Sequence, residues 1–229
     1  PGATPPTYFL LLNNDVVFEP NSVQRLVEFG DRKGPGVFGP RIVRHDRPDH
    51  LEMAWGDLTW SHVLAHYRGE EEKVGPRWNR DAPVSLLLGS VLLIHRSVFE
   101  KIGFFDETFF MYHEEVDFLY RAHLAGINAY FCNNSQVRHR GGHGTRQTPW
   151  KRIYWTRRNA VLFLRKHKAS LAKWLYYLAT LKMSIFYNIL CLRWKRTGVI
   201  LRGVRDGFAQ VHGQGNSLGS RSRRAEDSD

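Results

Sequence analysis

Short apolar runs alternate with turn signals and helical stretches over most of the chain, from about residue 8 to residue 145. We expect strands in YFLLL, GVFGPRIV, SLLLGSVLLIH and NAYFCN, because each run is apolar and is bounded by turn-forming residues. Helices are expected in three intervening stretches: from an Asn21 cap through Glu28, from a Ser97 cap through Ile102, and from Glu114 to Ala125, ended by Gly126. This alternation predicts an α/β sheet with flanking helices.

The character of the sequence changes after residue 148. Residues 149–212 are basic, aromatic and amphipathic with helical spacing, and residues 213–229 are polar and rich in glycine and serine. We therefore expect three regions: a sheet domain over residues 1–148, a basic helical region over 149–212, and a disordered tail over 213–229.

Composition limits the class of protein. A chain of 229 residues that is 42% hydrophobic can bury a substantial core. Its net charge of +11 predicts an anionic partner, such as a nucleotide phosphate, a nucleic acid or an anionic lipid surface. The two cysteines, Cys132 and Cys191, do not predict a disulfide framework and favour a reducing compartment.

The first apolar run stops on a carboxylate. YFLLL leads into Asn13, Asn14 and Asp15, and ligands of open α/β sheets gather at the carboxyl ends of strands. Asp15 is therefore expected at the rim of a cleft, where it could hold Mg²⁺ or Mn²⁺ together with a nucleotide diphosphate. The alternative is an Asx turn that only ends the strand.

A second group of acids lies in GFFDETFFMYHEEVDFLYRAHLAG. Glu114, Glu115 and Asp117 fall in the first turn of the expected helix, where the helix dipole alone explains carboxylates. The surrounding aromatic residues favour a further role, because desolvation moves a carboxylate toward the pKa range of a general base. Asp117 can pair with Arg121 one turn later, which would make Asp117 structural and Glu115 the acting group.

A histidine ends the last expected strand. In VRHRGGHGT, His139 precedes two glycines that would let the backbone approach a bound anion while the imidazole reaches inward. A surface histidine beside an ordinary turn is the alternative.

Taken in order, these segments resemble the later half of glycosyltransferase family 2 enzymes, in particular the rhamnosyltransferase-like branch. The resemblance rests on NND after a strand, on the block from LLGSVLLIHRS to LYRAHLAG, on VRHRGGHGT and on YWTRRNAVLFLRKH, and it runs from about residue 8 to 213. It implies a GT-A fold and the transfer of a sugar, with inversion, from a nucleotide diphosphate to a hydroxyl of a cell-envelope glycan or lipid-linked acceptor.

The resemblance implies which residues would bind the donor. Asn13 and Asp15 stand where the family has a D-x-D-like motif, so Asp15 corresponds to the ligand of the metal and diphosphate, with Asn13 replacing the first acid. His139 corresponds to the histidine that can complete the metal or diphosphate site.

It also implies which residues would serve the acceptor. Glu115 corresponds to the catalytic base, although the family usually has an aspartate there, and the longer side chain could hand the role to Glu114 or Asp117. Gly89 and Ser90 correspond to the small residues beside the acceptor.

The resemblance further predicts an incomplete catalytic domain. Family members begin with a strand-helix-strand unit that binds the base and ribose, and crossover units need about 30 residues each. Seven residues precede Tyr8. We therefore expect the donor-reading half to be missing from residues 1–229 and this fragment to be inactive alone.

Two other functions remain open. Aromatic residues interleaved with Lys and Arg over residues 150–202 suit single-stranded nucleic acid, although no nucleic-acid motif accompanies them. The chain could also be an inactive truncated remnant.

The helical region predicts contact with a membrane surface. Residues 171–192 are apolar, but Lys173 and Lys182 interrupt them, and a lysine near the bilayer centre costs about 2.5–3.5 kcal/mol. Interfacial aromatic residues and dense positive charge favour a peripheral helix pair on the cytoplasmic face of an anionic membrane. The alternative is that these helices only cover the sheet. The charges expected to face the lipid are Arg157, Arg158, Arg165 and Lys166.

Overall fold

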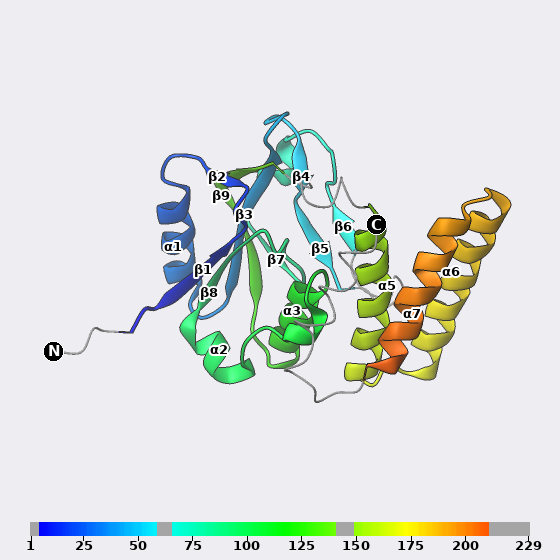
Figure 1. The fold of residues 1–229 in the computed structure, drawn as a ribbon. Helices are drawn as coiled ribbons and strands as arrows, with labels where there is room; N and C mark the ends of the chain where they lie inside the picture. The colour runs from blue at the N-terminus through cyan, green and yellow to red at the C-terminus, as the bar shows by residue number, and fades with distance from the viewer. Residues whose placement is uncertain (1–4, 59–65, 141–148, 211–229) are drawn as a thin grey trace. The chain divides into compact units, whose positions relative to one another are not determined.

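The computed structural model describes residues 5–58, 66–140 and 149–210 (Figure 1). The chain divides into two compact units. The first unit comprises Pro1–Phe105 and Glu115–Thr148, and the second comprises Asp106–Glu114 and Pro149–Asp229. The two glycines that follow Arg140 and the expected tail over 213–229 lie outside the described residues.

The first unit is built on a mixed sheet, as the alternating pattern predicts. Its strand order is β1-β8-β3-β9-β2, with β4 beside β3 and β7 beside β9. Strands β3 and β9 run parallel, and the other pairings are antiparallel. The strands are β1 (Tyr8–Leu12), β2 (Val16–Phe18), β3 (Val37–Arg44), β4 (Leu51–Met53), β7 (Ala82–Val84), β8 (Val91–His95) and β9 (Ala129–His139). A separate hairpin pairs β5 (Trp55–Asp57) with β6 (His66–Arg68).

The central strands form the core because they are apolar along most of their length. Phe38 on β3 and Leu93 on β8 are buried against Phe29 from helix α1 (Ser22–Lys33). Phe29 meets Phe38 edge to face, with ring centroids 6.0 Å apart, a favoured geometry for aromatic pairs. Helix α1 therefore covers one face of the sheet with its own apolar stripe.

Two of the expected strands have different lengths in the structure. In SLLLGSVLLIH, only Val91–His95 is a strand, because the glycine and serine before it sit in a turn whose Ser90 carbonyl accepts from the Asn13 amide at 2.9 Å. The strand expected in NAYFCN runs on to His139, since its later residues pair with both β2 and β3.

The expected helix caps were partly wrong. Helix α1 runs past Glu28 to Lys33, and Asn21 precedes it in a left-handed conformation without a side-chain capping bond. Helix α2 (Arg96–Ile102) is capped by His95, whose Nδ1 accepts from the Ser97 amide, so Ser97 is not the cap. Helix α3 (Glu114–Leu124) ends before Gly126, which adopts φ +71° as expected of a glycine that terminates a helix.

Three long helices follow in the second unit: α5 (Pro149–Lys166), α6 (Leu171–Leu190) and α7 (Trp194–Ala209). Short 3₁₀ turns occur at Pro76–Trp78 in the first unit and at Glu107–Phe109 in the second. Within the three described segments, no helix has both the length and the apolar character needed to cross a bilayer.

Helices α5 and α7 touch backbone to backbone. A Cβ atom added at Gly207 would lie 2.6 Å from the Arg158 carbonyl oxygen, and one at Gly203 would lie 2.7 Å from that of Tyr154. The same contact holds a hydrogen bond of 2.9 Å from the Tyr154 hydroxyl to Asp206. Burial, together with this bond and the Asp206 charge, raises the pKa of Tyr154 to about 12.

We predict opposite effects for two alanine substitutions in α7. Gly207→Ala should lower the free energy of unfolding by about 1–3 kcal/mol, because the neighbouring backbone cannot move aside cheaply. Gly198→Ala, in the same helix with open space around it, should raise it by about 0.5–1 kcal/mol. Denaturant unfolding followed by circular dichroism compares the two variants, and equal responses would contradict this packing.

Candidate active site

His139 joins three elements of the first unit through its two ring nitrogens. It ends β9 opposite Val16, and the neighbouring Arg140 amide donates to the Asp15 carbonyl at 3.0 Å, so the strand pairing itself sets Asp15 beside the ring. The His139 Nε2 lies 2.9 Å from Asp15 Oδ1, and Nδ1 lies 2.5 Å from Glu52 Oε2 on β4. The imidazole is 8% exposed.

Two carboxylates decide the charge of this ring. Burial alone would lower the pKa of His139, but the hydrogen bonds and negative charges of Glu52 and Asp15 outweigh it and raise the pKa above its ordinary value. The protonated ring can donate from both nitrogens at once. The structure therefore favours an imidazolium held between two carboxylates.

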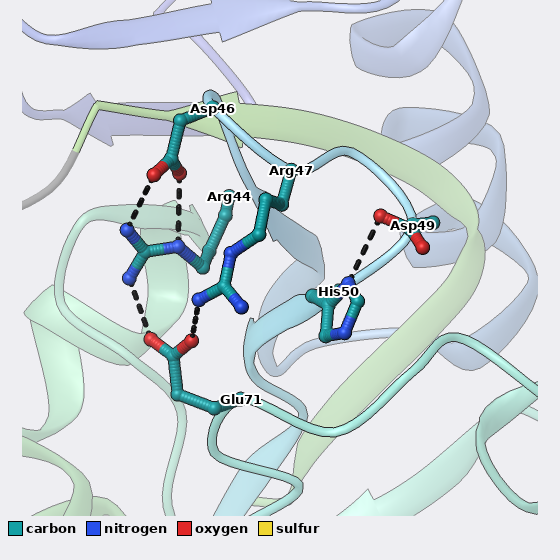
Figure 2. Close-up of polar contacts among 6 residues, drawn as sticks. All are labelled: Arg44, Asp46, Arg47, Asp49, His50 and Glu71. Atoms are coloured by element: carbon teal, nitrogen blue, oxygen red, sulfur yellow. Dashed lines mark hydrogen bonds and ion pairs between the residues drawn. The ribbon is translucent and has the colours of Figure 1, made fainter.

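A network of ion pairs stabilises the connection between β3 and β4, the strand on which Glu52 lies. Arg44, the last residue of β3, contacts Asp46 at 2.8 Å and Glu71 at 2.5 Å, and Arg47 also binds Glu71 (Figure 2). The hydrogen bond from Arg44 is the main reason that the pKa of Asp46 falls to about 2. The turn between β3 and β4 is thereby tied to the segment that contains Glu71.

The side chains around His139 can be compared with the ligand set that a divalent metal needs. Over residues 5–58, 66–140 and 149–210, no group of three or more His, Cys, Asp and Glu side chains is placed to hold a metal ion. Asp15 and Glu52 contact different nitrogens of one ring, so they do not converge on a common point. Asp15 is partly exposed and fits a site in which one carboxylate is supplemented by diphosphate oxygens.

Glu115 lies between a glycine and a tyrosine. A Cβ atom added at Gly89 would come within 3.2 Å of the Glu115 Cβ, so a larger residue at position 89 would press on this side chain. The Tyr67 hydroxyl, on β6, donates to Glu115 Oε1 at 3.1 Å. Glycine at 89 therefore leaves room for the carboxylate, and Tyr67 orients it.

Backbone contacts bring the other expected residues toward this point. Gly89 adjoins Ser90, whose carbonyl accepts from Asn13 two residues before Asp15. Ser90 is 4% exposed, and its hydroxyl oxygen has no hydrogen-bond partner in the part of the chain that the structure describes. A buried hydroxyl of this kind is satisfied when a ligand or a water binds beside it.

The other two acids near Glu115 have different surroundings. The side chain of Asp117 is 0% exposed and pairs with Arg121 at 2.8 Å, the i,i+4 pair that the sequence predicts. Arg121 also donates to the carbonyls of Ile102 and Phe104 at 2.6 and 2.7 Å. Asp117 is thus placed to fasten α3 to the preceding loop. Glu114 begins α3 and belongs to the second unit.

A strained segment leads into α3. Phe110, Tyr112 and His113 all adopt positive φ values, of 59°, 63° and 73°, which cost non-glycine residues energy. The fully buried Asn159 offsets this cost, since its Nδ2 donates to the carbonyls of residues 109, 111 and 112 at 2.8, 2.8 and 2.6 Å. Its neighbour Arg158 donates to the Thr108 carbonyl at 2.9 Å.

Sequence reasoning missed three of these residues. Glu52 and Tyr67 lie in three-residue strands without a recognisable motif, so no sequence signal pointed to them. Asn159 did carry a signal, because it is a polar residue directly before the apolar run AVLFL on a buried helix face.

No family model matches the chain. It is 29% identical to an N-acetylglucosaminyl-diphospho-decaprenol L-rhamnosyltransferase of Mycobacterium tuberculosis, over 69% of this chain and 54% of that protein. It is 30% identical to the low-salt glycan biosynthesis hexosyltransferase Agl10 of Haloferax volcanii, over 54% of this chain and 39% of that protein. It is 27% identical to the rhamnosyltransferase WbbL of Escherichia coli, over 70% of this chain and 62% of that protein.

These similarities cover only part of each relative, and the chain spans about half the length of the mycobacterial protein. The matched relatives are nevertheless all named as sugar transferases, in agreement with the resemblance seen in the motifs. The chain is a homologue of rhamnosyltransferases and a hexosyltransferase.

Proposed function

We propose that this protein is an inverting glycosyltransferase of the GT-A type, which moves a sugar from a nucleotide diphosphate to a hydroxyl of a cell-envelope glycan or lipid-linked acceptor. The observation that carries the proposal is the setting of Glu115, which is oriented by Tyr67 and packed on Gly89 in a homologue of sugar transferases. The mycobacterial relative is named for a lipid-linked diphosphate glycan, which supports an acceptor of that class.

Glu115 acts as the general base in this proposal. An acceptor hydroxyl ionises far above neutral pH, so a positioned carboxylate must take its proton as the new bond forms, a contribution of about 10²–10⁴ in rate. Tyr67 donates to Glu115 Oε1 and so orients the carboxylate that receives the proton. Ser90 and Gly89 border the acceptor, and the buried Ser90 hydroxyl supplies a hydrogen bond to it.

Asp15 and His139 act on the donor. A Mg²⁺ or Mn²⁺ ion bound there would supply charge stabilisation for the departing diphosphate. Asp15 would hold the ion, His139 would fix the Asp15 carboxylate through Nε2, and Asn13 would contact the diphosphate beside them. His139 can itself become a ligand once Nε2 has lost its proton. If Glu115 is not the base, Glu114 and Asp117 are the alternative candidates.

We further propose that the second unit docks on an anionic membrane at its cytoplasmic face. The support comes from α6, which exposes a row of large apolar side chains: Leu171, Leu175, Leu178, Met183, Phe186, Tyr187 and Leu190. Exposed apolar surface of this extent, flanked by cations, suits an interfacial helix.

Three of the four expected lipid-facing charges need correction. Arg158 is 3% exposed and binds the Thr108 carbonyl, while Arg165 donates to the Gly207, Phe208 and Gln210 carbonyls. Lys166 pairs with Asp106 at 2.7 Å. Arg158 and Arg165 stabilise the second unit by donating hydrogen bonds to backbone carbonyls that have no partner within a helix. Lys166 stabilises it through its ion pair. Exposed cations close in sequence to the apolar row include Lys182, Arg193 and Lys195.

The first prediction tests the base. Glu115→Gln should lower kcat by at least about 10²-fold with donor affinity nearly unchanged, because the amide keeps the shape but cannot accept a proton. Glu100→Gln, on the exposed face of α2, is the matched control and should be neutral. Steady-state kinetics of the full protein decide this, and near-normal turnover would transfer the role to Glu114 or Asp117.

The second prediction tests the donor site. Asp15→Ala should abolish the metal-dependent part of nucleoside diphosphate binding, and His139→Ala should weaken it less, because His139 mainly orients Asp15. Calorimetric titration with Mn²⁺ and with EDTA measures both effects, with the exposed Asp49→Asn as control. If EDTA and both substitutions leave nucleoside diphosphate binding unchanged, the proposed metal site is wrong.

The third prediction tests the membrane surface. Neutralising Lys182, Arg193 and Lys195 together should weaken binding to anionic liposomes on the order of a hundredfold, since each charge near such a surface contributes about 1 kcal/mol. Co-sedimentation at low and high salt measures this, with Arg32, Lys33 and Lys101 neutralised in the control. A wild-type protein that stays in the supernatant with anionic liposomes at low salt would end the docking proposal.

A further inference from the structure

A cavity of about 440 Å³ opens in the first unit, and none of the residues that line it belongs to the site described above. It is formed by the β5–β6 hairpin, the turn at Pro76–Trp78 and strand β7. Its volume lies within the range of about 300–1,000 Å³ that is usual for small-molecule sites. We propose that this cavity binds a neutral sugar residue, one unit of the acceptor glycan that lies beyond the reacting hydroxyl.

The inner wall of the cavity is aromatic and rigid. Trp55 and Trp78 meet edge to face with ring centroids 5.0 Å apart, and they are only 9% and 2% exposed. The Trp78 indole donates to Glu72 at 3.0 Å, and the Arg77 guanidinium lies 4.6 Å from the centre of the Trp78 ring. Such a wall suits the C–H face of a pyranose ring, which is flat and apolar.

The lining of the cavity contains both hydrogen-bond donors and acceptors. Arg68, Arg77 and Arg80 supply guanidinium donors, and Asp57 and Asp81 supply carboxylate acceptors. Asp57 is paired with Arg68, and Asp81 accepts from the Asn133 amide at 2.8 Å, so both carboxylates are held in place. A sugar hydroxyl donates and accepts at the same oxygen, and it therefore matches a lining of this kind.

Other ligand classes fit less well. The two carboxylates and three guanidinium groups of the lining leave a single net positive charge, and the carboxylates would repel a phosphate. An acyl chain would remove five charged side chains from water without compensating hydrogen bonds. A neutral polyhydroxyl ring can contact the apolar wall with its C–H groups and satisfy the polar side chains of the lining with its hydroxyls.

The hairpin relates this cavity to Glu115. Tyr67 on β6 donates to Glu115, while its neighbour Arg68 lines the cavity, and successive residues of a strand point to opposite faces. One strand thus carries the contact to the proposed base on one face and a cavity wall on the other. The identification of the sugar as part of the acceptor rests on the proposed function, whereas binding of a neutral sugar does not.

Direct binding tests the cavity. The full protein is applied to an array of neutral, uronic acid and sulfated oligosaccharides, and the strongest neutral glycan is titrated by NMR of the indole N–H groups. Arg77→Ala with Arg80→Ala should weaken this binding at least about tenfold, because two charge-assisted hydrogen bonds are lost. The control combines Arg32→Ala with Arg96→Ala on helices α1 and α2 and should bind as the wild type does.

Two outcomes of that experiment would overturn the proposal: no binding of any neutral glycan by the wild type, or equal binding by the cavity variant. If the double variant does not fold, Arg80→Glu alone, at an exposed position, gives the same comparison. The acceptor assignment is tested by kinetics, since the cavity variant should raise KM for a long acceptor about tenfold and leave kcat unchanged.

Glu115→Gln separates this inference from the proposed function. The variant should keep the sugar binding of the wild type, because Glu115 does not line the cavity. Sugar binding without transferase activity in the wild type would refute the transferase and the acceptor assignment while retaining the cavity as a sugar site. Transfer without a KM effect in the cavity variant would refute only the acceptor assignment.

Discussion

The imidazole of His139 shares its two nitrogens between the carboxylates of Asp15 and Glu52, and the arrangement of the candidate site depends on this contact. It joins the end of β9 to the residue before β2 and to β4. Removing one member of a buried ionic group leaves uncompensated charge and typically costs about 3–5 kcal/mol. The interaction therefore sets where Asp15 stands and how much of its carboxylate can face a ligand.

A second buried group stabilises a loop of the second unit. The Asn159 amide holds three carbonyls of residues 109–112, a segment with left-handed residues that would relax without this support. The conformation of this loop is therefore set by a residue far away in sequence.

A glycine and a short hairpin border the two places where we propose that ligands bind. Gly89 keeps space for Glu115, and the β5–β6 hairpin presents Tyr67 to Glu115 and Arg68 to a cavity. A base oriented on one face and a sugar-sized cavity on the other suit an enzyme whose acceptor is longer than one sugar. The proposed transferase function and the proposed sugar site thus use two faces of one structural element.

The sequence by itself determined the α/β class, the main strands, the Asp117–Arg121 pair and the relation to sugar transferases, because local periodicity and short motifs carry that information. It did not determine the start of β8, the cap at His95, or the internal roles of Arg158 and Lys166. Only the tertiary structure placed Glu52 beside His139 and Tyr67 beside Glu115, and only it showed the cavity lined by Trp55 and Trp78. The physical reason is that Glu52 and Tyr67 contact partners 87 and 48 positions away, and a contact of that range leaves no periodic signal in the chain.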